Sequence, residues 1–394
     1  MIYLDSNATS QVHPEVVDAM LPFLTEQWFN PSSGYRSAKA VKQAMATARE
    51  QVAALINAHP DEIVFTGCGT ESNNMTLKWL ARWVGRKESK IVTSAIEHSA
   101  VLRPCQAMAD VGYEVHHCGV DGEGRLRTDE FAGLVDGSRP GFASVMWSNN
   151  ETGVINPMVE ACRISREAGW AFHTDAIQAV GKMPVDVREV PVDFLSLSGH
   201  KFHAPKGIGA LYIREGVRFE PMLRGGGQED GRRSGTENVP FIIGLGKAAE
   251  LMRGELERDG HADVRRRRDR LEERLTAEIE GVVLNGSRAH RAPNIVHASF
   301  ENCEAAGLLI LLDEAGVQCS AGSACMTGKQ QPSHVQVAMG IPAEQARSSL
   351  RISLSIFTTD EEVEEAATAV AKAVEKLRSV QGPPGVGPVV VHGG

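Results

Sequence analysis

Short apolar runs alternate with helix-like stretches up to about residue 214, and this alternation limits the fold more than any other feature of the chain. Runs such as DEIVFTG (61–67) and VDFLSLSG (192–199) have the length of strands, whereas TESNNMTLKWLARWV (70–84) has the length and period of a helix. Repeated strand–helix units indicate a mostly parallel sheet with helices on both faces. The sequence therefore predicts an α/β fold, and such folds bind ligands at the carboxyl ends of their strands.

The pattern changes near residue 257. A long charged helix is predicted over about 257–281, with the run RRRRDR (265–270) on its solvated face, followed by the strand SLRISLS (349–355) and a closing amphipathic helix. We expect a large domain over 14–256 and a smaller α+β domain formed by 1–13 and 257–378. Residues 379–394 are rich in glycine and proline and are predicted to be a disordered tail.

Charge and cysteine content narrow the class of protein. The formal net charge is −9, and the seven cysteines are scattered without CxxC spacing. These features argue against nucleic acid or a membrane as partner, against a metal site and against a disulfide framework. The sequence shows no secretory-signal pattern and no apolar run of the ~20 residues that a membrane span needs. We expect a cytoplasmic protein with reduced thiols.

Lys201 lies directly after a predicted core strand and before a loop rich in glycine and proline. A lysine in that position is poorly solvated, which lowers its pKa and frees its amine as a nucleophile, although most lysines in hairpin loops are simply exposed. Asp175 ends another predicted strand, in FHTDAIQAVG (172–181). A Schiff-base lysine and a strand-end aspartate are typical of pyridoxal phosphate sites, where the carboxylate keeps the pyridine nitrogen protonated.

Two further segments indicate a phosphate site. TGCGTESNN (66–74) places Gly69 and Thr70 where a strand turns into a helix, and the amides and dipole of a helix amino terminus favour an anion. Ser198 and His200 flank Lys201, and both side chains can bind an anion. The segment matches neither the Walker loop nor G-x-G-x-x-G, so a nucleotide is not predicted.

Taken together and in order, these motifs resemble those of a cysteine desulfurase of the NifS/IscS type, within the class V aminotransferase family and fold type I of the pyridoxal phosphate enzymes. The resemblance covers about residues 2–376. Its motifs include YLDSNAT (3–9), TGCGTESNN (66–74), SNNETGVINP (148–157), HTDAIQAVGK (173–182), SGHKFHAPKG (198–207), RSGTENVP (233–240) and SAGSAC (320–325). It implies a mostly parallel seven-stranded sheet in the large domain, pyridoxal 5'-phosphate as cofactor, and a homodimer.

The resemblance also implies roles for single residues. Lys201 would carry the cofactor, and Asp175 would pair with its pyridinium nitrogen. The other cofactor contacts would be Gly69, Thr70, Ser198 and His200 at the phosphate, Asn150 and Gln178 at the ring, His98 stacked on the ring, and Thr236 at the phosphate of the partner subunit.

Two of the implied roles have competing interpretations. His98 would assist proton transfers, but a histidine at this position also suits a cap for the helix that follows it. Arg351 would bind the substrate carboxylate, because its fork of N–H groups matches a carboxylate, and the nearby Arg347 is the rival candidate.

Cys325 lies in SAGSACMTGKQQPSHV (320–335), whose small and polar residues are typical of a surface loop. The composition of the loop alone does not distinguish a functional Cys325 from a cysteine that lies on the surface by chance. The resemblance implies that its thiolate takes the sulfur of L-cysteine as a persulfide, which leaves L-alanine. The resemblance also implies that the persulfide sulfur passes to a sulfur-acceptor protein such as an iron–sulfur scaffold. Cys319 is predicted to be structural.

Three functions remain open at this point. The first is a cysteine desulfurase. The second is a selenocysteine lyase or another class V aminotransferase; an aminotransferase needs no loop cysteine, whereas selenocysteine would use the same residues. The third is a sulfur carrier without catalysis, which would not need Lys201, Asp175 and His98 together.

Overall fold

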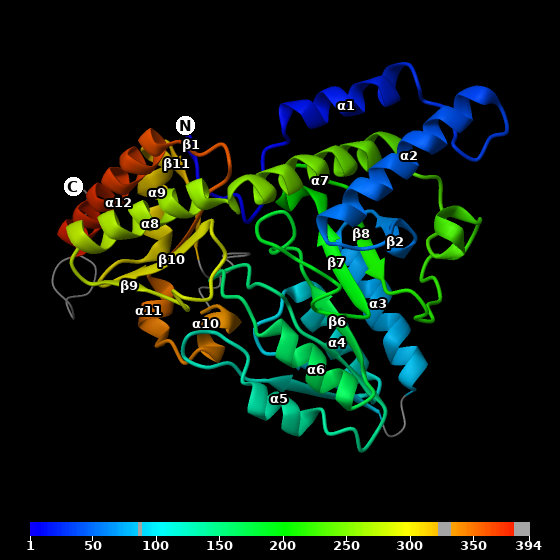
Figure 1. Cartoon of the computed structure of the whole chain (residues 1–394). Helices are drawn as coiled ribbons and strands as arrows, with labels where there is room; N and C mark the ends of the chain where they lie inside the picture. Colours follow the sequence, from blue (N-terminus) through cyan, green and yellow to red (C-terminus); the bar gives the residue numbers. More distant parts are fainter. Residues whose placement is uncertain (86–88, 322–331, 382–394) are drawn as a thin grey trace, which may run out of the picture.

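The computed structural model describes residues 1–85, 89–321 and 332–381, whose elements form two lobes (Figure 1). The large lobe is built on a seven-stranded sheet in which β7, β6, β5, β3 and β4 run parallel, while β8 and β2 are antiparallel to their neighbours. In spatial order the strands are β2 (Ile63–Thr66), β8 (Gly209–Ile213), β7 (Phe194–Ser198), β6 (Ala171–Asp175), β5 (Gly141–Ser144), β3 (Lys90–Ser94) and β4 (Glu114–Cys118). The predicted mostly parallel seven-stranded sheet is confirmed.

Helices cover both faces of this sheet, which explains why its central strands are buried on both sides. On β7, Leu195 and Leu197 join the core beneath α2 and α7, whereas Phe194 joins the core beneath α3 and α4. The helices of this lobe are α1 (Pro14–Thr25), α2 (Arg36–Leu55), α3 (Gly69–Val84), α4 (Ser99–Asp110), α5 (Thr128–Leu134), α6 (Met158–Glu167) and α7 (Val239–Asp259), with short 3₁₀ turns at Pro60–Glu62, Gly199–Lys201 and Gln228–Gly231.

The helix predicted over 257–281 is wrong at its start. The structure ends α7 at Asp259 and begins α8 (Ala262–Glu278) after Gly260 and His261, which both have positive φ. Gly260 adopts the left-handed conformation that closes a helix, so the chain turns there rather than continuing as one helix. Figure 1 shows α7 lying along the large lobe and α8 along the small one, so this turn lies between the lobes.

The small lobe combines a four-stranded antiparallel sheet, in the order β12, β13, β10, β9, with a parallel pair formed by β1 and β11. Its core lies between the four-stranded sheet and the helices α8, α9 and α12. The remaining elements are β1 (Ile2–Tyr3), β9 (Val282–Leu284), β10 (Ile295–Phe300), α9 (Ala305–Glu314), β11 (Val317–Gln318), β12 (Ser320–Ala321), α10 (His334–Ala338), α11 (Ala343–Arg347), β13 (Ser349–Ser353) and α12 (Asp360–Gln381). Helix α12 thus runs three residues into the segment predicted as a tail.

Apolar and polar residues alternate along strand β13, and this alternation determines which face of the sheet Arg351 occupies. Leu350 and Ile352 belong to the core beneath the helices. The residues between them therefore face the other side of the sheet, where β10 presents His297 opposite Arg351. This second face is polar yet buried, since His297 is fully buried and Arg351 is only 9% exposed. The face is turned toward the large lobe, because the Arg351 guanidinium reaches Asn150 there.

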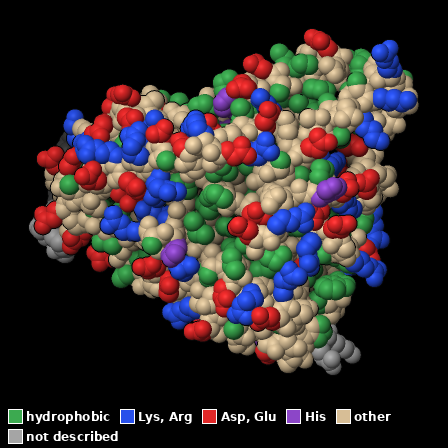
Figure 2. All heavy atoms as spheres, viewed as in Figure 1, with side chains coloured by type: hydrophobic (Ala, Val, Ile, Leu, Met, Phe, Trp, Pro, Cys, Tyr) green, Lys and Arg blue, Asp and Glu red, His purple; other side chains and the backbone are tan. Residues whose placement is uncertain are grey.

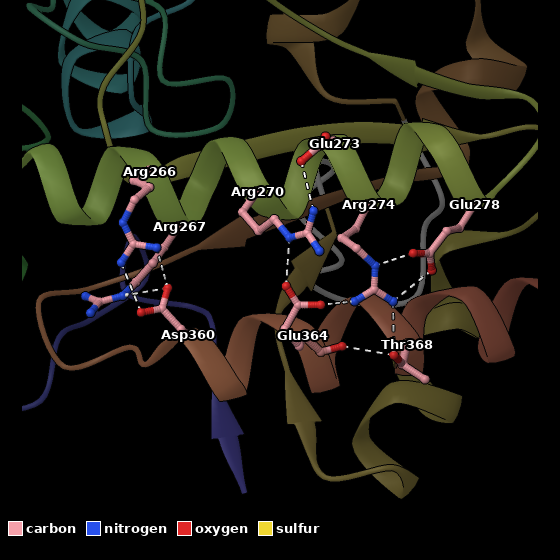
Figure 3. A network of polar contacts seen from close by, with 9 residues as sticks. All are labelled: Arg266, Arg267, Arg270, Glu273, Arg274, Glu278, Asp360, Glu364 and Thr368. Atoms are coloured by element: carbon pink, nitrogen blue, oxygen red, sulfur yellow. Dashed lines mark hydrogen bonds and ion pairs between the residues drawn. The ribbon is translucent and has the colours of Figure 1, made fainter.

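The arginine-rich run divides between two environments. Arg266, Arg270 and Arg274 form ion pairs with Asp360 and Glu364 on α12 (Figure 3). Arg268 does not lie on the solvated face as predicted: it is 5% exposed and donates to the Ala292 carbonyl at 3.0 Å. Over the lobe with α8 and α12, Figure 2 shows acidic and basic side chains intermixed.

Two features that would indicate a membrane or metal protein are absent from the described residues. Neither a helix long and apolar enough to cross a membrane nor a metal-ligating group of three His, Cys, Asp or Glu side chains occurs in ranges 1–85, 89–321 and 332–381.

Candidate active site

Lys201 closes the short turn after β7, and its amine is held by backbone. Its Nζ donates to the carbonyl oxygens of Asn7 and Ala8, each at 2.7 Å. Desolvation lowers the pKa of Lys201 to about 8, and the positive charge of Arg351 adds to this effect. The amine is therefore present in its neutral, nucleophilic form to a useful extent near neutral pH, as the sequence predicts for a lysine at a strand end.

Asp175 is the last residue of β6 and is 3% exposed. Its carboxylate accepts from Asn73 Nδ2 at 2.7 Å and from the Ile177 amide at 3.0 Å. Burial raises its pKa, while the nearby His98 opposes that shift. Among the described residues it has no ion-pair partner within 4.0 Å, so it is a buried acid that lacks a cation.

The position of His98 is compatible with both interpretations that the sequence left open. It caps α4, because its Nδ1 accepts from the Ala100 amide at 3.1 Å, and it also lines the cavity that contains Lys201 and Asp175. With Nδ1 as acceptor, the neutral ring carries its proton on Nε2. Desolvation lowers the pKa of His98 even though part of the ring is exposed, so the neutral form dominates.

The amino terminus of α3 is the place predicted for the phosphate, and its local structure suits an anion. Gly69 and Thr70 begin this helix, and the capping residue Cys68 gives it no side-chain hydrogen bond, so the first amides are free to bind an anion. A Cβ at Gly69 would lie 2.2 Å from Ile177 Cδ1, so the Ile177 side chain would have to move to admit any larger residue. Ser198 and His200 line the same cavity.

Arg351 reaches this cavity from the small lobe and Arg347 does not. Arg351 donates from Nη1 to the Asn150 carbonyl at 3.1 Å and from Nη2 to Asp5 Oδ1 at 2.8 Å, which leaves its buried Nε–H without a partner. Arg347 lines a separate surface groove at the end of α11. A free N–H on a held guanidinium suits a carboxylate ligand.

The amino-terminal segment supplies wall residues that sequence reasoning missed. Asn7 is 3% exposed, and its main chain and side chain bond to residues of both lobes, among them Lys201 and Ser353. Asp5 holds Arg351 and accepts from the Ser320 hydroxyl at 2.7 Å. The motif YLDSNAT was visible, but the pairing of β1 with β11 that brings it here joins residues 315 positions apart, from 2 to 317.

Two buried carboxyl groups behind the cavity were also missed. Glu97 accepts from the Ser94 hydroxyl at 2.6 Å and from the Met146 amide at 2.7 Å, and burial raises its pKa to about 8. Burial likewise raises the pKa of Glu151 to about 7. Each adjoins a motif residue, but nothing in the sequence marks these carboxyls as buried.

One cavity of about 360 Å³ collects most of the predicted residues. Its predicted members are Gly69, Thr70, His98, Asn150, Asp175, Gln178, Ser198, His200, Lys201 and Arg351. Thr236 is exposed and does not line it, so its contact with a partner subunit stays a prediction. Cys325 lies outside the described residues. Burial raises the pKa of Cys319 to about 12, which makes that thiol unreactive, as expected of a structural cysteine.

These residues fit pyridoxal phosphate. Asp175 lacks the cation that a protonated pyridine nitrogen supplies, the bare amino terminus of α3 suits the phosphate, and Lys201 lines the same cavity.

Comparison with known proteins settles the family. The model of the aminotransferase class-V family matches residues 2–365. The chain belongs to the class-V aminotransferases. Members of this family depend on pyridoxal phosphate, so the cofactor prediction is confirmed.

Similar proteins of this family cover nearly the whole chain. The chain is 48% identical over 382 residues to a cysteine desulfurase of Gluconacetobacter diazotrophicus, covering 96% of this chain and 94% of that one. It is 45% identical over 381 residues to the cysteine desulfurase NifS of Azotobacter vinelandii, with the same coverage. A solved NifS-like protein superposes with a TM-score of 0.89 at 35% identity, covering 95% of this chain and 99% of the other. The fold class and the family resemblance are therefore confirmed.

Proposed function

We propose that this chain is a cysteine desulfurase, an enzyme that converts L-cysteine to L-alanine and passes the sulfur to an acceptor protein. The observation that carries the proposal is the meeting of Lys201, Asp175 and Arg351 in one cavity of a chain that is 48% identical to a cysteine desulfurase. Pyridoxal phosphate supplies, when bound, an electron sink for negative charge on the substrate α-carbon.

Lys201 and His98 provide the proton transfers. Lys201 would hold the cofactor and, once replaced by the substrate amine, remove the α-proton; its pKa of about 8 suits a base near neutral pH. His98 Nε2–H is the donor that faces no internal partner among the described residues, and it would return a proton to carbon. Asp175 would keep its charge beside the cofactor nitrogen.

Arg351 orients the substrate, and Cys325 accepts its sulfur. The substrate carboxylate would bind the unpartnered Nε–H of Arg351. The Cys325 thiolate would form an S–S bond to the substrate sulfur while the substrate C–S bond breaks; its electron pair stays on carbon, which is protonated to give L-alanine. Ser320 pairs with Arg351 between β12 and β13, so the described chain before Cys325 ends beside the cavity.

The experiment that tests this function is a single turnover with L-cysteine under reductant. The wild-type protein and Cys319→Ala, a matched control six positions away, should each release alanine and sulfide one to one. Cys325→Ala should give no alanine and no persulfide adduct by mass spectrometry. Alanine at the wild-type rate from Cys325→Ala would show that Cys325 is not the sulfur acceptor. Release of a 2-oxo acid instead of alanine would favour an aminotransferase, and turnover of L-selenocysteine alone would favour a lyase.

A second copy of this chain is the first partner we propose. Val17, Leu21 and Leu24 have the spacing of one face of α1, Trp28 follows the end of that helix, and all four side chains are between 48% and 68% exposed. Helix α1 packs on α7, which begins three residues after Thr236. Burial of this face in a homodimer would accord with Thr236 acting across subunits.

The acceptor class is proposed from the same activity. A persulfide on Cys325 is a sulfur donor, and an iron–sulfur scaffold protein is the acceptor that we propose, in the cytoplasm, where the six described cysteines would stay free as the structure has them.

A further inference from the structure

Lys182 is a second lysine in the interior, one turn beyond the cofactor-binding residue Gln178. It is 8% exposed, and no carboxylate within ranges 1–85, 89–321 and 332–381 pairs with it. Buried lysines without an anion are costly, so one retained beside a catalytic site calls for a specific role.

The Lys182 amine donates to two acceptors. One is Asn7 Oδ1, at 2.8 Å, and the other is Gln178 Oε1. Both acceptors belong to residues that touch the reacting centre, because the Asn7 carbonyl accepts from Lys201 Nζ and Gln178 lines the cavity. Gln178 Nε2 donates to the same Asn7 carbonyl at 2.9 Å, which closes the network.

Donor and acceptor chemistry makes this network directional. The Lys182 amine donates to the Gln178 carboxamide oxygen while the Asn7 carbonyl accepts from its nitrogen, so both partners favour the orientation in which the carbonyl end faces Lys182. The NH₂ end must then face Asn7 and the cavity. One of its two hydrogens is used by the Asn7 carbonyl, which leaves the second for a ligand.

We propose that Lys182 is a positioning residue: it fixes the Gln178 carboxamide so that a hydrogen-bond donor, rather than an acceptor, is presented to the ring oxygen of the cofactor. Without Lys182 the amide is free to turn over, and its carbonyl would then oppose the Asn7 carbonyl and the cofactor oxygen.

Charge supports this role. Burial lowers the pKa of Lys182 well below its usual value, and the charges of Lys201 and Arg351 add to the effect. In either protonation state the amine has N–H groups enough for both acceptors. It can therefore orient Gln178 without placing a permanent cation behind Lys201.

The test measures the affinity of apoenzyme for pyridoxal phosphate in a double-mutant cycle. Lys182→Met should weaken binding about tenfold, roughly one lost hydrogen bond. In a Gln178→Ala background the same change should alter the Kd less than twofold, because Lys182 acts through Gln178. The matched control is Asn294→Ala, which removes another donor to Asn7 Oδ1. Its effect on the Kd should be the same with and without Gln178, so the cycle should show no coupling between Asn294 and Gln178. Equal weakening by Lys182→Met in both backgrounds, or a wild-type Kd in the single variant, would overturn the proposal.

A conservative variant covers the case in which Lys182→Met does not fold. Lys182→Arg keeps the donors but is always charged, so its Kd should stay within about threefold of wild type. Its cation should lower the pKa of Lys201, measured by the pH dependence of reductive methylation of Lys201 in apoenzyme. No such shift, together with a weakened Kd, would contradict the proposal. Because desulfuration is not measured, failure here would leave the proposed function standing; only the cofactor assignment is assumed.

Discussion

The large and small sheets supply the cavity from different parts of their strands. In the large sheet, Asp175 and Ser198 are the last residues of β6 and β7, and Lys201 follows three positions later. In the small sheet, Arg351 is the middle residue of β13. A strand-end residue leaves the core and meets a ligand at the sheet edge, whereas a mid-strand residue depends on which face it occupies. The residues proposed to bind the cofactor are thus placed by sheet topology, and the residue proposed to bind the substrate is placed by strand register.

The largest expected effect is on the topology side. Lys201→Ala should lower the rate of alanine formation by about 10³-fold, because it removes both the cofactor attachment and the base. Lys206→Ala, an exposed lysine five positions on, is the control and should keep the wild-type rate. Near-normal turnover by Lys201→Ala would mean that the strand-end rule found the wrong residue.

The register side predicts a selective change in substrate affinity. Arg351→Ala should raise the KM for L-cysteine about 10- to 100-fold, the range of a lost charged hydrogen bond, with a smaller effect on kcat. Arg347→Ala should leave KM unchanged, because its side chain lies in another groove. A KM effect from Arg347 rather than Arg351 would show that the alternation on β13 does not set substrate binding.

A pH experiment compares one buried histidine in each sheet. Burial lowers the pKa of His173 on β6 and of His297 on β10 to about 3 each. Their unfolded forms bind protons below about 6.5, so folding stability is full above that pH and falls as the pH drops toward 3. Each histidine should lower the free energy of unfolding by roughly 2 kcal/mol between pH 7 and pH 5.

The sequence offers a way to observe the two sheets separately. All five tryptophans lie between residues 28 and 170, in the large lobe, whereas circular dichroism reports on both lobes. His173→Gln should flatten the pH dependence of urea unfolding followed by fluorescence. His297→Gln should flatten only the part followed by circular dichroism; flattening of both signals would mean that the lobes unfold as one unit.

The smallest effect is expected at the surface of the small lobe. Arg270→Ala breaks exposed pairs of the α8–α12 ladder in Figure 3 and should lower Tm by about 1 °C, an effect that added salt removes. Arg268→Ala, two positions earlier, should cost several degrees more, because it leaves the buried Ala292 carbonyl without its partner. Equal shifts would contradict the division of this run into an outer and an inner part.

Sequence reasoning found the strand-end residues because each rests on local evidence. Lys201, Asp175 and Gly69 follow apolar runs that are strands in the structure, and the rule for ligands at strand ends needs no long-range contact. Arg351 was named through a resemblance, although the alternation in SLRISLS already separates it from the apolar face.

What escaped prediction depends on contacts between distant segments. Asn7 lines the cavity and Asp5 binds the Arg351 that lines it, and both are brought there by the pairing of β1 with β11, which no local pattern records. The break between α7 and α8 was missed because the helical pattern continues on both sides of Gly260. A single glycine within such a pattern does not by itself indicate that a helix ends. The burial of Lys182 could not be predicted either, because it depends on contact with the distant Asn7.

The pairing of β1 with β11 also determines how late during synthesis the amino-terminal segment can reach its folded position. Ile2 leaves the ribosome first, but its partner Val317 follows 315 residues later, roughly 15–60 s at ordinary translation rates. During that interval Asn7 cannot be fixed against Ser353, so the nascent chain has the lysine but not the finished wall around it. The cavity around Lys201 is therefore completed only when nearly the whole chain has been made.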